Sequence, residues 1–192
     1  MSNAKKYILT AITLGLIAAS GALLIAGTNM LTRGPIAKNE EKKINSGIAT
    51  IFDGYSNIFV KDQEDVEKTK DNKFVDHIYY VYDGDPEDET PDTFVGVAIR
   101  TSGSNDYGKI SLIIGFTPDA VYKNLSVITN EQSFASTLKN KYLAPLINGE
   151  RDLQDVSCGA TYGATTVKDM VNNAMDIAKV KIPAYLGGSS NG

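Results

Sequence analysis

The segment Asp155-Val156-Ser157-Cys158-Gly159-Ala160-Thr161-Tyr162-Gly163-Ala164-Thr165-Thr166 gathers small and hydroxyl side chains directly before a stretch with helical periodicity. Apolar residues recur there at spacings of three and four, which predicts a helix from about Thr166 to Lys179. Thr165 or Thr166 is then the expected N-cap, because a threonine hydroxyl can accept a hydrogen bond from a free N–H group of the first turn. We interpret the segment before this helix as a functional loop.

The two glycines of this loop suit a ligand that approaches the backbone. Gly159 and Gly163 have no Cβ, so the chain can turn tightly or lie close to a ligand at both points. A glycine-rich turn that leads into a helix presents free N–H groups and a partial positive charge, which favour an anion such as phosphate. Most such turns are only helix caps, and the residues alone leave both interpretations open.

A resemblance to a known family rests on the run Asp155-x-x-Cys158-Gly159-Ala160-Thr161. This run is similar to the flavinylation signature Asp-x-x-(Ser/Thr)-Gly-Ala-Thr of FMN-binding domains in the G subunit of the Rnf complex and the C subunit of the sodium-translocating NADH:quinone reductase. The resemblance implies that Thr161 carries FMN through a phosphoester bond. The cofactor-binding residues that we predict are Thr161, Cys158, Gly159, Ala160, Tyr162, Gly163, Thr165 and Glu131, and no metal ligands are predicted.

Three departures from the family pattern bear on this prediction. Cys158 stands where Ser or Thr is usual, and Gly163 stands where a second Thr is usual. The family's Glu-Thr-Pro-Gly-(Leu/Ile)-Gly segment, which lies near the flavin, keeps only Glu131 here, followed by residues 132–136. Slower, non-covalent or absent attachment therefore stay open as alternatives.

Three residues have roles that the sequence leaves open. Thr165 ends a second Gly-Ala-Thr and is a rival attachment point. Phe134 or Tyr162 is a candidate to stack on the flavin ring, although ordinary packing is the alternative for either.

The segment Tyr107-Gly108-Lys109-Ile110 also resembles the family in its order of elements.

Composition limits the kind of partner and cofactor. The 192 residues are 42% hydrophobic and 22% charged, with a net charge of −4, which suits one globular domain with an appendage. This charge argues against nucleic acid as a partner. A single cysteine, Cys158, excludes an internal disulfide and a four-cysteine iron–sulfur or zinc site, and we interpret it as a small substitute for serine. The only histidine, His77, lies in an apolar run and is interpreted as structural.

Residues 7–31 contain no charged side chain and are rich in Leu, Ile and Ala. About 20 such residues span the hydrocarbon core of a membrane, so this run predicts a transmembrane helix, and it is longer than the core of a cleaved signal peptide. More basic residues follow the run than precede it, and this charge count alone favours a cytoplasmic domain. The resemblance instead implies that the soluble domain lies on the extracytoplasmic side of the cell membrane.

The remaining chain predicts an α+β fold, in which an antiparallel sheet with flanking helices follows the membrane helix. The strands expected from β-branched and aromatic runs are 74–82, 93–100, 109–116 and 120–129, and a helix is expected at 133–146. Residues 61–73 are expected to form an exposed loop or short helix. The acidic run 83–92 is interpreted as a solvated hairpin loop, with a calcium site as the alternative. We divide the chain into a membrane anchor (1–33), a connecting helix (34–60), an FMN-binding domain (61–186) and a disordered tail (187–192).

The resemblance implies an electron-carrying flavoprotein subunit of a membrane-bound, Rnf-like, ion-translocating ferredoxin:NAD oxidoreductase, which is not catalytic alone. Its implied partners are the other membrane subunits of such a complex and, during maturation, a flavin transferase that moves FMN from FAD to threonine. Two alternatives stay open. One is a free-standing membrane-anchored flavoprotein that passes electrons to an extracellular acceptor. The other is a scaffold subunit of the same complex without flavin.

Overall fold

The structure, a computed structural model, describes residues 3–85 and 92–189 of the chain. It divides into two compact units, residues 1–42 and 43–192. Most of the acidic run 83–92 lies outside the described residues, as do residues 190–192, so the hairpin-loop and calcium interpretations of that run both stay predictions.

Helix α1 (Asn3–Ile51) contains both the predicted membrane span and the first part of the predicted connecting helix. It ends nine residues before the predicted limit at 60. Among the residues that the structure describes, no helix is long and apolar enough to cross a membrane. The side chains of residues 8–10 and 23–31, which belong to the predicted span, lie outside that description.

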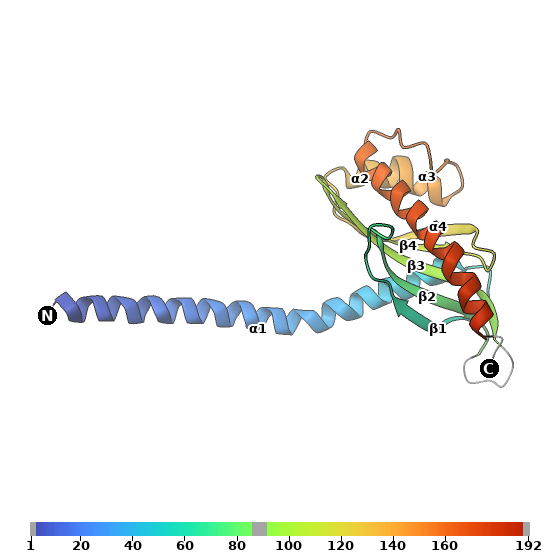
Figure 1. The fold of residues 1–192 in the computed structure, drawn as a ribbon. Coiled ribbons are helices and arrows are strands. Elements are labelled where there is room, and N and C mark those ends of the chain that lie inside the picture. Colours follow the sequence, from blue (N-terminus) through green and yellow to red (C-terminus); the bar gives the residue numbers. More distant parts are fainter. Residues whose placement is uncertain (1–2, 86–91, 190–192) are drawn as a thin grey trace. The chain divides into compact units, whose positions relative to one another are not determined.

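The second unit is built on a five-stranded antiparallel sheet with the strands in sequence order (Figure 1). The strands are β1 (Ile58–Asp65), β2 (Val75–Asp83), β3 (Thr93–Asn105), β4 (Gly108–Phe116) and β5 (Tyr122–Asn130). The α+β class, the antiparallel pairing and four of these strands confirm the prediction. β3 continues five residues beyond its predicted end, which leaves a two-residue turn before β4.

The prediction of a loop or short helix at 61–73 is wrong for its first part, because residues 61–65 belong to β1. β1 is an edge strand, where charged side chains are tolerated and discourage pairing with another chain. Its register with β2 shifts between Val60 and Asp62, as in a bulge, and bulges are common at sheet edges. Glu64 on this strand accepts hydrogen bonds from Tyr80 (2.7 Å) and Lys181 (3.0 Å), which explains a carboxylate within a strand.

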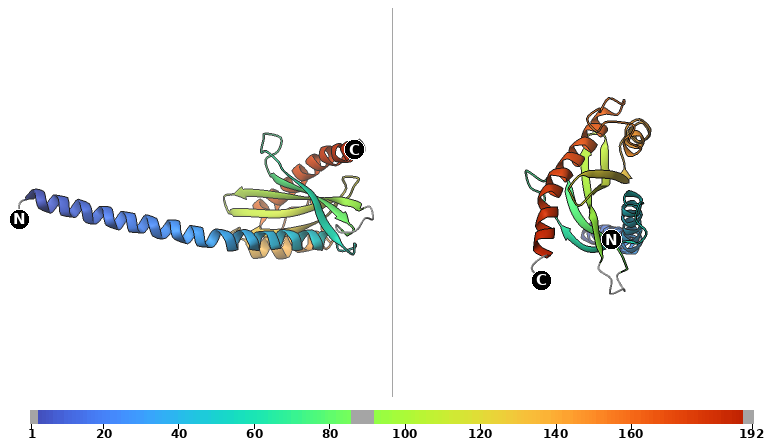
Figure 2. Two further views of the ribbon diagram at one scale, coloured as in Figure 1. Left: turned by 90° about the horizontal axis from the view of Figure 1, so that it is seen from below. Right: turned by 90° about the vertical axis from the view of Figure 1, so that its right-hand side faces the viewer.

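Helices cover both faces of the sheet. Along β4, Leu112 and Ile114 belong to the core beneath helix α4 (Thr161–Ser189), whereas Ile113 belongs to the core beneath the last turns of α1, as the alternation of a strand requires. Ile48 and Ile51 of α1 are buried in that second core, so the last turns of α1 pack on the sheet through an apolar face. Figure 2 shows α4 and the end of α1 on opposite sides of the sheet.

A helix that contains one π-turn precedes the functional loop. It consists of α2 (Ala135–Leu138), the π-helical turn η1 (Lys139–Leu143) and α3 (Ala144–Ile147). The helix predicted at 133–146 is thus confirmed within two residues at each end. Its buried residues, Leu138, Tyr142, Leu143 and Leu146, pack into the same core as α4.

The final helix differs most from its prediction. α4 begins at Thr161, five residues earlier than expected, and continues to Ser189, so the first residues of the predicted disordered tail are helical. The assignment of Thr165 or Thr166 as N-cap is therefore wrong. Thr166 lies within the helix, where its hydroxyl donates to the carbonyl of Tyr162 one turn earlier (3.0 Å).

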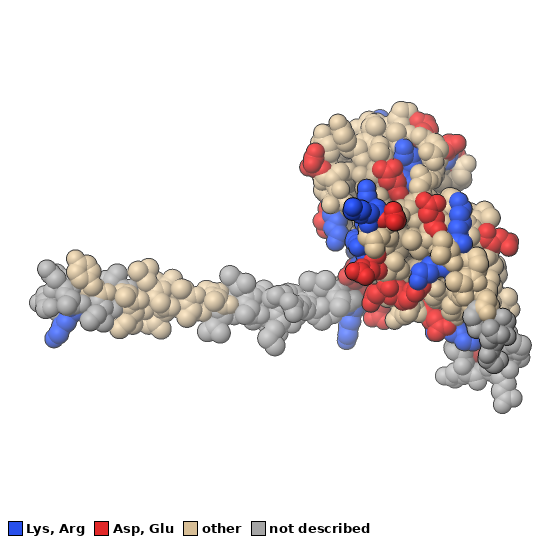
Figure 3. All heavy atoms as spheres, in the orientation of Figure 1, with Lys and Arg blue, Asp and Glu red and all other residues tan. Residues whose placement is uncertain are grey.

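Charged side chains of both signs are interspersed over the folded part of the chain (Figure 3). His77 lies on β2, and its Nδ1 is 2.6 Å from Oδ1 of Asp65 on the neighbouring strand. Its side chain is only 18% exposed, in agreement with a structural interpretation.

Candidate functional site

A cavity of about 270 Å³ lies at the start of α4 and is formed by three separate segments of the chain. Its lining residues are Tyr107, Gln132, Phe134, Leu138, Gly159, Ala160, Thr161, Tyr162 and Gly163. The structure therefore brings five of the eight predicted cofactor-binding residues together around one cavity. It also places Phe134, the other candidate for stacking, in the same wall.

Local backbone geometry explains how Thr161 reaches the cavity. Gly159 has a φ of +79°, a left-handed conformation that glycine adopts without strain, so the chain turns sharply there. The N–H of Ala164 donates to the carbonyl of Ala160 (3.0 Å), so Ala160 occupies the N-cap position and Thr161 is the first helical residue. The Thr161 side chain is exposed beside the free N–H groups and the positive end of the helix dipole.

The opposite wall is the turn between β3 and β4, which is pinned to residues 131–133. The N–H of Glu131 donates to the carbonyl of Lys109, and the N–H of Ser133 donates to the carbonyl of Tyr107. Both hydrogen bonds are 2.8 Å long. Gly108 has a φ of +132°, and a Cβ there would collide with the carbonyl of Glu131. A side chain at position 108 would therefore push the two segments apart.

Two polar side chains fix this turn against its surroundings. Gln132 is buried and donates from Nε2 to the carbonyl of Gly108. Asn105 donates from Nδ2 to the hydroxyl of Thr166 (2.9 Å), which ties the end of β3 to α4. The turn between β3 and β4 is thus hydrogen-bonded to Gln132 on one side and to α4 on the other, and these contacts hold the two walls of the cavity together.

Three aromatic side chains form the rim of the cavity. Tyr107 lies between the other two, with ring centroids 5.9 Å from Phe134 and 5.3 Å from Tyr162. All three are exposed, by 37% for Tyr107, 54% for Phe134 and 67% for Tyr162. Exposed aromatic faces at these separations offer a surface on which a planar ring can stack.

Two departures from the family pattern meet in this structure. Gly163 lies in the first turn of α4, and a Cβ at this position would be 2.9 Å from Cδ2 of Leu138 and 3.3 Å from Oε1 of Gln132. Gln132 belongs to the segment that replaces the family's Thr-Pro-Gly run. The glycine at 163 and the altered segment at 132–136 therefore fit each other by packing.

Three predicted site residues do not line the cavity. Cys158 is buried in the core beneath α4, Glu131 is exposed to solvent, and Thr165 is half-buried one turn along the helix from Thr161. Of the two candidate attachment points, only Thr161 borders the cavity.

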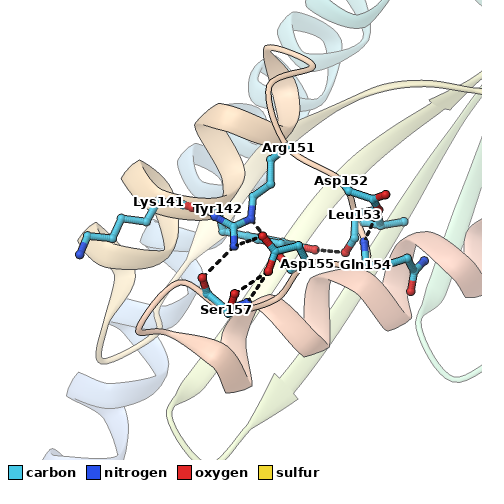
Figure 4. Close-up of polar contacts among 8 residues, drawn as sticks. All are labelled: Lys141, Tyr142, Arg151, Asp152, Leu153, Gln154, Asp155 and Ser157. Atoms are coloured by element: carbon cyan, nitrogen blue, oxygen red, sulfur yellow. Dashed lines mark hydrogen bonds and ion pairs between the residues drawn. The ribbon is translucent and has the colours of Figure 1, made fainter.

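Asp155, the first residue of the signature, lies away from the cavity and closes a small turn (Figure 4). Its Oδ1 accepts hydrogen bonds from the hydroxyl (2.5 Å) and the N–H (3.2 Å) of Ser157, and its Oδ2 lies 2.9 Å from Nη2 of Arg151. These contacts, with the Ser157 hydroxyl foremost, lower the pKa of the Asp155 carboxyl. The carboxylate is thus held ionised within its own loop.

Sequence reasoning missed Gln132 and Leu138 as cavity residues and gave Tyr107 no role in binding. Leu138 is an ordinary buried position on an amphipathic helix, and nothing in its sequence context distinguishes it. One feature of the sequence could have indicated Tyr107. It precedes Gly108 and begins the segment 107–110, which resembles the family in its order of elements.

Comparison with known proteins bears on the N-terminal part of the chain. A search of curated proteins gave no match. Residues 1–51 match the family model described as the RnfG N-terminal region, a range that ends where α1 ends and does not include the cavity. This match supports the identification of the chain as an RnfG-like subunit.

Proposed function

We propose that this chain is the electron-carrying flavoprotein subunit of a membrane-bound, Rnf-like, ion-translocating oxidoreductase, with FMN attached through its phosphate to Thr161. The observation that carries the proposal is the position of Thr161. Its side chain is exposed at the first residue of α4 and borders a cavity with an aromatic rim. The match of residues 1–51 to an RnfG region supports the proposal from the other end of the chain.

The cavity fits the two ends of FMN differently. The helix N-terminus at Thr161 suits the phosphate, because free N–H groups and the helix dipole favour negative charge. The rim of Tyr107, Phe134 and Tyr162 suits the flat isoalloxazine ring. A cavity of about 270 Å³ lies just below the usual range of about 300–1,000 Å³ for small-molecule sites, so part of a bound FMN would extend beyond the cavity.

The attachment would transfer FMN from the pyrophosphate bond of FAD to the threonine hydroxyl, which forms a phosphate ester. The Thr161 hydroxyl oxygen forms the new bond to the phosphorus of the FMN half of FAD, the bond that links the two phosphates breaks, and AMP leaves. The hydroxyl proton is lost to a base. A flavin transferase has to supply that base, because no titratable side chain is among the residues that line the cavity apart from the phenols of Tyr107 and Tyr162.

A bound flavin accepts and donates electrons, and this chain positions it. The single cysteine cannot hold an iron–sulfur cluster, so other redox centres belong to other subunits. Residues 7–31, which carry no charge, form the membrane anchor in this proposal, with the folded unit on the extracytoplasmic side.

The test compares two threonines of the same helix. The full-length chain is produced together with a flavin transferase as wild type, Thr161→Val and Thr165→Val, and flavin fluorescence is recorded on a denaturing gel. We expect fluorescence from wild type and Thr165→Val and none from Thr161→Val, because valine keeps the shape of threonine but has no hydroxyl. Fluorescence that persists in Thr161→Val and disappears in Thr165→Val would move the bond to Thr165. Free FMN released on denaturation would replace the covalent bond by non-covalent binding, and an absence of flavin would favour a scaffold subunit.

A further inference from the structure

Arg151 makes more polar contacts than any other side chain of the described loop before α4. Its Nε donates to the carbonyl of Asp155, its Nη1 donates to the carbonyl of Lys141, and its Nη2 donates to the carbonyl of Ser157 (Figure 4). All three hydrogen bonds are 2.8 Å long. Nη2 also lies 2.9 Å from Oδ2 of Asp155. The guanidinium thus holds both sides of the loop to the preceding helix, and its side chain is only 17% exposed.

Lys141 lies in the π-helical turn η1, and the sequence beyond it limits the backbone N–H groups that can reach its carbonyl. Pro145, four residues further on, has no N–H to donate to the Lys141 carbonyl. The chain then reverses at Gly149, whose φ is +74°, and the N–H of Glu150 donates back to the carbonyl of Pro145 (2.8 Å). This helix ending is common with a left-handed glycine and directs the next residue, Arg151, back along the helix.

Tyr142 provides the second support of the loop. The Arg151 guanidinium lies 5.5 Å from the centre of the Tyr142 ring, within the range of a cation–π contact. The Tyr142 hydroxyl donates to the carbonyl of Leu153 (2.7 Å). Three carbonyls of the loop, at residues 153, 155 and 157, are therefore held by two side chains.

Asp155 uses both oxygens of its carboxylate within this network. Oδ1 accepts from Ser157 and Oδ2 pairs with Arg151, and neither Asp155 nor Arg151 borders the cavity. We propose that Arg151 is the positioning residue for the loop that presents Thr161, and that Asp155 of the signature acts through Arg151 and not through contact with flavin or flavin transferase. The inference rests on the proposed function, because presentation of Thr161 matters only if this hydroxyl is modified.

Thr161 lies only a few residues from the carbonyl that Arg151 holds, so loss of Arg151 should strongly affect the position of the Thr161 hydroxyl. Only Cys158, Gly159 and Ala160 separate the Ser157 carbonyl, held by Arg151, from Thr161. Cys158 and Ala160 are buried, so a shift at Ser157 is passed on to the start of α4. A misplacement of about 1 Å in a reacting group can cost about 100-fold in rate.

A double-mutant cycle tests the inference. Arg151→Gln removes the guanidinium, whereas Asp155→Asn keeps the Oδ1 acceptor for Ser157 and removes only the charge that faces Arg151. The full-length chain in four forms, wild type, the two single variants and the double variant, is incubated with FAD and flavin transferase, and the initial rate of covalent flavin incorporation is measured. We expect a loss of about 10- to 100-fold for Arg151→Gln, a smaller loss for Asp155→Asn, and a double variant no slower than Arg151→Gln.

Two controls separate positioning from loss of stability. Ile113→Val lowers the stability of the same unit from the core on the other face of the sheet and should leave the rate unchanged. Arg151→Lys keeps a positive charge that can pair with Asp155, but an ammonium group cannot reach all three carbonyls as the planar guanidinium does. Its rate should therefore lie between those of wild type and Arg151→Gln.

The outcomes distinguish the inference from the proposed function. A wild-type rate in Arg151→Gln, or the full Asp155→Asn loss repeated in the Arg151→Gln background, would overturn the inference while the proposed function stands. If wild type takes up no flavin, the proposed function fails, and amide hydrogen exchange decides the positioning role by itself. Arg151→Gln should then speed exchange at residues 153–160 at least about tenfold relative to Ile113→Val, and equal exchange in both variants would overturn it.

Discussion

Replacement of Gly163 by threonine, the residue usual in the family, tests the packing around the cavity. A Cβ at this position would be 2.9 Å from Cδ2 of Leu138, a side chain that is fully buried, and 3.3 Å from Oε1 of Gln132. A contact of 2.9 Å between two carbon atoms is well below the optimum of about 3.5–4.0 Å, so Leu138 or the helix must move.

The size of the effect follows from two opposing contributions. Overpacking of a well-packed core costs about 1–3 kcal/mol. Removal of a glycine from a helix gains up to about 1 kcal/mol for alanine and less for the β-branched threonine. We therefore expect Gly163→Thr to lower the free energy of unfolding by about 1–2 kcal/mol, which corresponds to about 2–4 °C in Tm for each kcal/mol in a chain of this size. Gly163→Ala has the same Cβ but a larger helix gain of about 1 kcal/mol, so it should lower the free energy of unfolding by less, about 0–2 kcal/mol.

The assay is thermal and urea unfolding of the full-length chain, followed by the near-ultraviolet circular dichroism of its tyrosines. Leu138→Ala provides the matched control, because it removes the atom that the new Cβ meets. In that background Gly163→Thr should cost at least about 1 kcal/mol less than in wild type, since neighbouring residues are coupled in energy. An unchanged midpoint for Gly163→Thr, or the same cost with and without the Leu138 side chain, would refute the proposed packing.

Two further predictions concern the aromatic rim and the dependence of stability on pH. In a Thr161→Val chain, where FMN can only bind non-covalently, Tyr162→Ala should weaken the affinity about 2- to 12-fold by equilibrium dialysis, because a stacked aromatic pair contributes about 0.5–1.5 kcal/mol; equal affinities would exclude Tyr162 from the site. Partial burial opposes ionisation of Glu64, but hydrogen bonds from Tyr80 and Lys181 outweigh it and lower the pKa of the carboxyl. Because the folded pKa is the lower one, this stabilisation is present above the unfolded value of about 4.3 and is lost as the pH falls through the folded pKa. Glu64→Gln should therefore have a lower Tm than wild type at pH 7 and approach it near pH 3, and a difference that is constant between these pH values would contradict the assignment.

The signature loop allowed one wall of the cavity to be predicted from sequence, and the other wall could not be. Residues 159–163 are adjacent in the chain, so a motif is enough to group them. Tyr107 and Gln132 come close to them only because Gly108 lets the hairpin turn lie against residues 131–133, a contact that depends on the folded sheet. No local pattern in the sequence records that contact.

Two errors in the predicted elements have a common cause, which is that local preference was overridden by packing. The capping preference of threonine placed the start of α4 at Thr165 or Thr166, although the helix begins earlier and the absence of a side chain at Gly163 lets it pack on Leu138. The charges of residues 61–65 argue against a strand, but at the edge of a sheet they face solvent or find partners such as Lys181.

The most direct test of the central claim is the mass of the intact chain after it has been produced together with a flavin transferase. The account predicts an increase equal to FMN less one water molecule, mapped by fragmentation to the peptide that contains Thr161. An unmodified chain that also releases no flavin on denaturation would contradict it.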